Sequence, residues 1–134
     1  MMRKITKIIV HCSATPEGRD YTVADIDHWH KQRGWKGIGY HYVIYRDGSI
    51  HAGRKIEEIG AHCTGQNANS IGICYIGGLA TDGKTPKDTR TPEQRTALRS
   101  LINELKAKFP GVTVHGHREF ANKACPCFDV KTEL

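Results

Sequence analysis

A chain of 134 residues has the length of one domain and can bury a core without help from disulfides. Hydrophobic residues make up 38% and charged residues 25%, which excludes collagen-like, coiled-coil and intrinsically disordered proteins. No apolar run approaches the roughly 20 residues that span a bilayer, and the start (Met1–Val10) lacks the apolar core of a signal peptide. We therefore expect one domain, residues 1–134, that is made in the cytoplasm and has no stable membrane association.

Basic residues outnumber acidic ones by 20 to 14, which gives a net charge of +6. Such a surface attracts polyanions, including nucleic acid and cell-wall polymers. The basic residues are dispersed, however, and aromatic residues, only 7% of the chain, are not interleaved with them as in single-strand binders. We interpret the charge as solvated surface and expect no nucleic-acid partner.

The cysteine and histidine content favours metal binding over disulfides. Five cysteines are an odd number in a chain without a secretory signal, which argues against a disulfide framework. No CxxC pair is present, which argues against a zinc finger, a zinc ribbon or a thioredoxin-type motif. Eight histidines are many for so short a chain, and some of them are candidate metal ligands.

In chain order, residues 7–11 predict a buried strand, because three β-branched residues follow one another there. A helix is predicted next, with Thr22 as its N-cap, Asp25 completing a weak capping box and Gly34 ending it. Its apolar stripe recurs every three residues: Val23, Ile26 and Trp29.

Residues 40–45 have the β-branched and aromatic character of a strand, and Asp47-Gly48 is a strong turn signal. Together with residues 50–53 they predict a β-hairpin. Residues 70–76 predict a fully buried central strand, and the polar residues 80–90 predict a surface loop.

The strongest helix signal is Thr91-Pro92-Glu93-Gln94, a capping box with proline in the first turn. Pro110 requires this helix to end by about Phe109, and residues 112–115 predict a last strand before an irregular remainder. Strands alternate with helices, so we predict an α/β domain with a central mixed β-sheet flanked by helices.

One group of residues could bind a metal. His11 lies at the end of the first predicted strand, where α/β folds place ligand-binding groups, although a lone histidine there is more often structural. His115 and His117 alternate along a strand and so face the same side, and Cys125 follows in a loop that could fold back. Imidazole and thiolate are ligands that zinc favours. On spacing alone, His115 and His117 remain rival ligands.

The other histidines carry weaker signals. His28 and His30 are two positions apart on a helix, so they point to different faces and cannot chelate together. His51 falls in the hairpin, where we expect it to be exposed. His41 and His62 remain open between groove-lining and structural roles.

Several short motifs lie along the chain from about residue 8 to residue 130. They are Val10-His11-Cys12-Ser13-Ala14-Thr15, Gly34-Trp35, Gly39-Tyr40-His41, Arg46-Asp47-Gly48, Gly60-Ala61-His62, Gly65-Gln66-Asn67-Ala68-Asn69-Ser70-Ile71-Gly72 and Lys123-Ala124-Cys125-Pro126-Cys127-Phe128-Asp129. In sequence and in order, these motifs resemble those of the type-2 N-acetylmuramoyl-L-alanine amidases, the family of the phage lysozymes that are amidases, whose fold peptidoglycan recognition proteins share.

The resemblance implies a zinc ion held by His11, His117 and Cys125, with Tyr40 and Lys123 as catalytic residues. It also implies a substrate groove lined by His62, Asn67 and His41. Each role has a plainer alternative. Tyr40 could pack at the sheet edge, Lys123 could be solvated, and Asn67 could serve a turn.

Three residues close in sequence to the implied metal ligands have other expected roles. Cys12 should point away from His11 into the core. Glu119 is a candidate proton donor, although an exposed structural role suits it better. Cys127 stands where a serine is common in the family.

The implied activity is hydrolysis of the amide between the lactyl group of N-acetylmuramic acid and L-alanine of peptidoglycan. A non-catalytic peptidoglycan-binding module on the same fold is the alternative, and a zinc-dependent nucleic-acid binder is a weaker one because the ligands lack compact finger spacing. We expect a monomer that reaches the cell wall after lysis or by holin-type release.

Overall fold

Two fully buried parallel strands form the centre of the protein. In this computed structural model, which describes residues 3–134, β1 (Lys7–Cys12) pairs with β5 (Ser70–Tyr75). Their near-continuous apolar sequences are typical of strands covered on both faces. Both strands confirm the sequence prediction to within one residue. Met1 and Met2, which belong to the predicted chain start and domain, lie outside the described residues.

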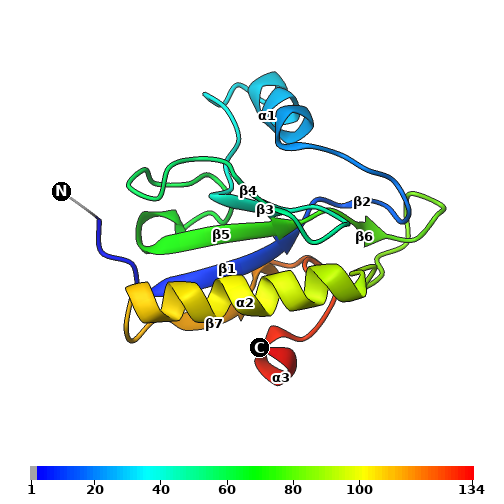
Figure 1. Ribbon diagram of the computed structural model, residues 1–134. Coiled ribbons are helices and arrows are strands. Elements are labelled where there is room, and N and C mark those ends of the chain that lie inside the picture. Colours follow the sequence, from blue (N-terminus) through cyan, green and yellow to red (C-terminus); the bar gives the residue numbers. More distant parts are fainter. Residues whose placement is uncertain (1–2) are drawn as a thin grey trace.

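The remaining strands complete a five-stranded mixed sheet in the order β4-β3-β5-β1-β7 (Figure 1). The predicted hairpin is present as β3 (Tyr42–Ile44) and β4 (Ile50–Ala52), which pair antiparallel. Its turn places Gly48 at φ +87°, a conformation that favours glycine. On the other side, β7 (Thr113–Gly116) runs parallel to β1. A second, two-stranded sheet joins β2 (Thr15–Pro16) to β6 (Gly78–Leu79).

Both long helices begin at the capping boxes that the sequence predicted. α1 (Val23–Gln32) starts after Thr22, and Gly34 follows its end at φ +89°. α2 (Pro92–Lys108) starts after Thr91, whose hydroxyl accepts the backbone N–H of Gln94. Figure 1 shows α2 lying along the sheet and α1 on the far side of the sheet from it.

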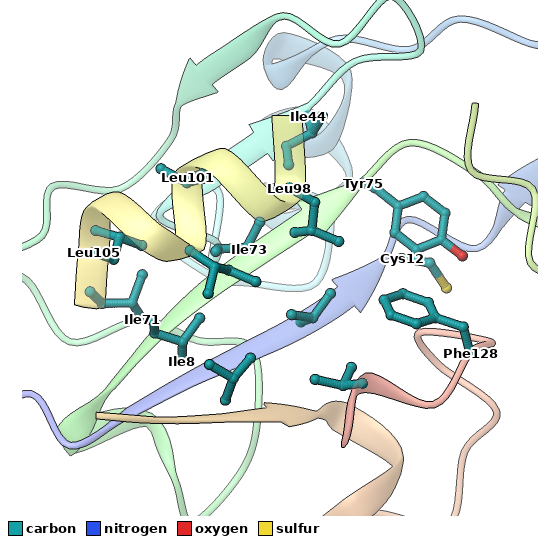
Figure 2. Close-up of a cluster of buried hydrophobic side chains, with 14 of the residues drawn as sticks. Ile8, Cys12, Ile44, Ile71, Ile73, Tyr75, Leu98, Leu101, Leu105 and Phe128 are labelled. Carbon is teal, nitrogen blue, oxygen red and sulfur yellow. The ribbon is translucent and has the colours of Figure 1, made fainter. Parts of the chain in front are cut away.

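The alternation of side chains along β1 separates the core from the future site. Ile8 and Cys12 belong to one buried cluster with residues of β5 and α2, in which Cys12 lies beside Tyr75 and Phe128 (Figure 2). The prediction that Cys12 enters the core is therefore confirmed. Because side chains alternate along a strand, His11 points to the face opposite that of Cys12, and α1 covers this face with Ile26.

The C-terminal segment is more ordered than predicted. It contains a 3₁₀ turn, η2 (His117–Glu119), and a short helix, α3 (Val130–Glu133). Another 3₁₀ turn, η1 (Asn67–Asn69), precedes β5. Arg90 anchors this segment: it forms ion pairs with Asp88 and Glu133, and its guanidinium lies 3.4 Å from the centre of the Phe128 ring.

The prediction of a surface loop is thus wrong at Arg90, which is only 7% exposed. A polar segment gives no local sign that one of its cations will pair with a residue 43 positions away. The predicted α/β class with a central mixed sheet and flanking helices is confirmed. Among residues 3–134, no helix combines the length and apolarity needed to cross a bilayer.

Candidate active site

Three donor side chains from distant parts of the chain converge at one edge of the sheet. His11 comes from the end of β1, His117 follows the end of β7, and Cys125 lies in the loop after η2. Their ligand atoms all lie within 4.8 Å of one another. β1 and β7 are parallel neighbours, so their carboxyl ends meet at the same edge, and this explains how residues 106 positions apart come into contact.

The loop that carries Cys125 is fixed by hydrogen bonds from three directions. The backbone N–H of Arg118 donates to the Cys125 carbonyl at 2.8 Å, and the buried Tyr75 hydroxyl donates to the Pro126 carbonyl at 2.7 Å. The backbone N–H of Cys12 donates to the Cys125 sulfur at 3.1 Å. These contacts hold the Cys125 sulfur at the end of β1, beside His11.

The donor set fits zinc. The Nδ1 atoms of His11 and His117 face each other at 3.1 Å. They can form a hydrogen bond only if one of the two rings carries its proton on Nδ1; otherwise two lone pairs point at the same space. Burial lowers the pKa of both imidazoles, and a neutral imidazole is the form that binds metal. Two imidazoles and one thiolate leave the fourth position of a tetrahedral zinc open for water or substrate.

The structure separates the two rival histidines on β7. His115 is not in the cluster: its Nδ1 lies 2.9 Å from a Glu119 oxygen and its Nε2 lies 2.6 Å from the Thr113 hydroxyl. The strand ends at Gly116 and the chain turns into η2, so the imidazoles of residues 115 and 117 diverge. Glu119 also accepts the backbone N–H of Gly116, a structural role at the strand end.

Tyr40 and Lys123 border the donor cluster. Two adjoining cavities, of about 180 and 320 Å³, share both of these residues together with His117 in their linings. The smaller, which we call the inner cavity, also reaches Cys125, and the larger, the outer cavity, reaches His62 and Asn67.

Tyr40 is half-buried, with its ring centre 5.1 Å from that of His11. Burial raises the pKa of its phenol well above the ordinary value, so the hydroxyl keeps its proton at neutral pH. Lys123 is exposed, and its positive charge contributes to the lowered pKa of His117. A neutral hydroxyl and a cation therefore face the same space as the donors.

The residues predicted to line a groove occupy three different environments. His62 is 9% exposed, and its Nδ1 lies 2.8 Å from His11 Nε2. Asn67 uses its side-chain oxygen to accept the backbone N–H groups of His62 and Cys63, at 3.0 and 2.9 Å, which is the turn role that the sequence left open.

His41 lies deeper than these two. It is 1% exposed, and its ring accepts the N–H of Gly72 and lies 2.8 Å from the Glu58 carbonyl oxygen. It is not part of the lining of either cavity.

His30 and Arg33 are charged or titratable residues of the cavity walls that sequence reasoning missed. Both line the inner and the outer cavities. His30 accepts the backbone N–H of Gly39 at 2.9 Å, which fixes the segment leading to Tyr40. The available signal was the position of His30 four residues after Ile26, which places it on the buried face of α1.

Comparisons with known proteins agree with this geometry. The sequence model of the family described as N-acetylmuramoyl-L-alanine amidase matches residues 1–128. The endolysin of Escherichia phage T7 is 47% identical over 124 residues, which cover 92% of this chain and 82% of that protein. The endolysin of Klebsiella phage KP32 is 44% identical over 129 residues, 96% of this chain and 85% of that protein.

Solved structures show the same relationship. The N-acetylmuramoyl-L-alanine amidase LysC from Clostridium intestinale superposes with a TM-score of 0.79 at 32% identity, over 92% of this chain and 77% of that one. Drosophila PGRP-LB superposes with a TM-score of 0.79 at 29% identity, over 94% of this chain and 76% of that one. On this match of sequence, fold and clustered donor residues, the chain belongs to the N-acetylmuramoyl-L-alanine amidase family.

Proposed function

We propose that this protein hydrolyses the amide between the lactyl group of N-acetylmuramic acid and L-alanine in peptidoglycan, with one zinc ion held by His11, His117 and Cys125. The observation that supports this most directly is the convergence of these three donors beside cavities that Tyr40 and Lys123 line. The family relationship supplies the substrate class.

The proposed roles follow from the chemistry of each group. When bound, zinc would lower the pKa of a water molecule and polarise the amide carbonyl. The protonated Tyr40 hydroxyl would hold the attacking water by a hydrogen bond. The Lys123 ammonium would stabilise the negative charge that develops on the carbonyl oxygen. Because His30 and Arg33 line the inner cavity together with Cys125, the reacting amide would lie between the C-terminal end of α1 and the Cys125 loop.

The outer cavity would receive the substrate next to the reacting amide. His62 and Asn67 line it, in keeping with the predicted groove. The contact of His41 with substrate stays a prediction, and its buried position suggests that it would act by supporting the strand beneath the groove.

The biological setting of the proposal comes from the phage endolysin relatives. We propose that residues 1–134 act as one amidase domain and as a monomer, and that the protein reaches the cell wall after lysis or through holin-type release. A net charge of +6 would favour its association with an anionic wall.

Mass spectrometry of purified peptidoglycan after digestion tests the proposed bond. We expect soluble stem peptides with a free L-alanine amino group, together with glycan chains that keep their lactyl groups. Cys125→Ala should release none, whereas Cys127→Ala, a matched cysteine outside the donor cluster, should release as much as the parent protein. Binding of an uncut polymer would instead identify a recognition module.

A further inference from the structure

His62 occupies an unusual place behind one of the donor residues. Its Nδ1 lies 2.8 Å from Nε2 of His11, and its Nε2 lies 3.4 Å from the hydroxyl oxygen of Ser70. His11 Nδ1, on the other side of that ring, faces His117 and the donor cluster. Both nitrogens of His11 are therefore committed, one to the cluster and one to His62.

The protons of the His11 and His62 rings can be placed in two ways. A neutral imidazole has one donor and one acceptor nitrogen. If His11 offers the lone pair of Nδ1 to a metal, its proton is on Nε2, and His62 Nδ1 must accept it. His62 then carries its own proton on Nε2, next to Ser70. In the opposite arrangement His62 Nδ1 donates, and the proton on His11 Nδ1 blocks the metal position.

The His62 ring is held by close contacts that admit little movement. A Cβ atom at Gly60 or at Gly72 would lie 2.6 Å from the ring carbon Cδ2 of His62, so only glycine fits at either position. Asn67 fixes the backbone on which the ring is mounted, through the N–H groups of residues 62 and 63. Such enclosure maintains the geometry of the contact with His11.

We propose that His62 is a positioning residue for the metal site: by accepting the Nε2–H of His11, it keeps the Nδ1 lone pair of His11 directed towards His117 and Cys125. This inference rests on the proposed zinc site. Metal-binding histidines usually donate their second N–H to a carboxylate, a backbone carbonyl or water. Here the acceptor is an imidazole, which orients His11 without adding a negative charge beside the metal.

Zinc affinity, measured by chelator competition without substrate, tests the proposal. His62→Phe removes the acceptor and should weaken zinc binding by roughly 10- to 100-fold, the range for lost partners of metal ligands. His62→Asn places a carbonyl oxygen near the former Nδ1 and should restore affinity to within a few-fold. His51→Phe is the control, because it alters a histidine of β4 whose partners are the Ser49 hydroxyl and the Tyr45 ring, and it should leave affinity unchanged.

A second measurement uses the unaltered protein and does not depend on how the variants fold. Nitrogen-15 NMR of the zinc-loaded protein should find the protons of both His11 and His62 on Nε2. A proton on Nδ1 of either ring would overturn the proposal, and so would equal zinc affinity in His62→Phe and the parent. If His62→Phe lowers turnover at saturating zinc while zinc affinity is unchanged, His62 acts on substrate and the proposal is wrong. Failure of the parent protein to bind zinc would overturn the proposed function itself.

Discussion

At the scale of single residues, the cavity walls contain two kinds of groups with separable consequences. The three donors would hold the metal, whereas Tyr40 and Lys123 line the cavities without belonging to the donor cluster. Loss of a donor should therefore change metal content, and loss of a wall residue should change only the rate.

We expect Tyr40→Phe and Lys123→Ala to keep fold and zinc content but to lower kcat, each by roughly 10²–10³-fold if the lost group is comparable to one oxyanion-hole donor. KM should change little, because these contacts strengthen as charge develops on the reacting amide. Single-turnover assays on muropeptide, with zinc measured in each sample, provide the check. Near-normal turnover in both variants would refute the proposed roles.

Cys125→Ala should behave in the opposite way, losing zinc and activity together because a thiolate ligand is removed. Cys127→Ala provides the comparison, since it also deletes a thiol two positions away but leaves the donor cluster intact. Metal analysis of both purified variants gives the readout. Stoichiometric zinc in Cys125→Ala would show that the ligand set is wrongly assigned.

At the scale of elements, α2 is tied to the sheet by one buried side chain as well as by its apolar face. Gln94 is fully buried: its oxygen accepts the N–H of Thr91, and its amide nitrogen donates to the carbonyls of Ile44 and Ile76. It thus joins the helix start to the ends of β3 and β5. One side chain provides hydrogen-bond partners for the helix cap and for the ends of both strands.

Gln94→Ala should lower the free energy of unfolding by about 2–4 kcal/mol, because it removes the three hydrogen bonds of this buried side chain and opens a small void. Thr91→Ala, which removes only the capping hydroxyl, should cost about 1 kcal/mol. Urea unfolding of the two variants and the parent measures both values. A smaller loss for Gln94→Ala than for Thr91→Ala would contradict this account of α2.

The elements that the sequence predicted are those with local signals. Both capping boxes lie within four consecutive residues, so the starts of α1 and α2 could be predicted from them. By contrast, α3 and the buried Arg90 depend on the contacts of Arg90 with Glu133 and the Phe128 ring, both of which are far from Arg90 in the chain. No local pattern encodes such pairing.

At the scale of the whole molecule, the site exists because the sheet places β1 between β5 and β7. This order brings His11 beside His117, and the family motifs were needed to choose His117 over His115 because spacing alone fits both. The walls formed by His30 and Arg33 could not be predicted, since their position depends on how α1 packs across the sheet edge.

The buried histidines also make the stability of the metal-free protein depend on pH. Burial lowers the pKa of His62 to about 3 and those of His30 and His41 to about 4, from an ordinary value of 6.5. At a pH between the folded and the unfolded pKa of these histidines, the unfolded chain binds more protons than the folded one. The free energy of unfolding must therefore fall as pH decreases from about 6.5 to 4. Above pH 6.5 this contribution is fully present.

Urea midpoints of the chelator-treated protein, measured from pH 7.5 to 4.5, should therefore be constant at first and then decline below about pH 6.5. His41→Phe, which replaces one of the three groups by a side chain that does not titrate, should show a shallower decline. A midpoint that stays constant down to pH 4.5 would contradict the burial of neutral histidines.

Stepwise addition of zinc to the chelator-treated protein, with release of stem peptides measured at each step, tests whether amide hydrolysis depends on one zinc ion held by His11, His117 and Cys125. We expect activity to be absent at the start, to rise in proportion to added zinc and to stop rising at about one equivalent per chain. Full activity of protein shown by metal analysis to contain no metal would contradict this expectation.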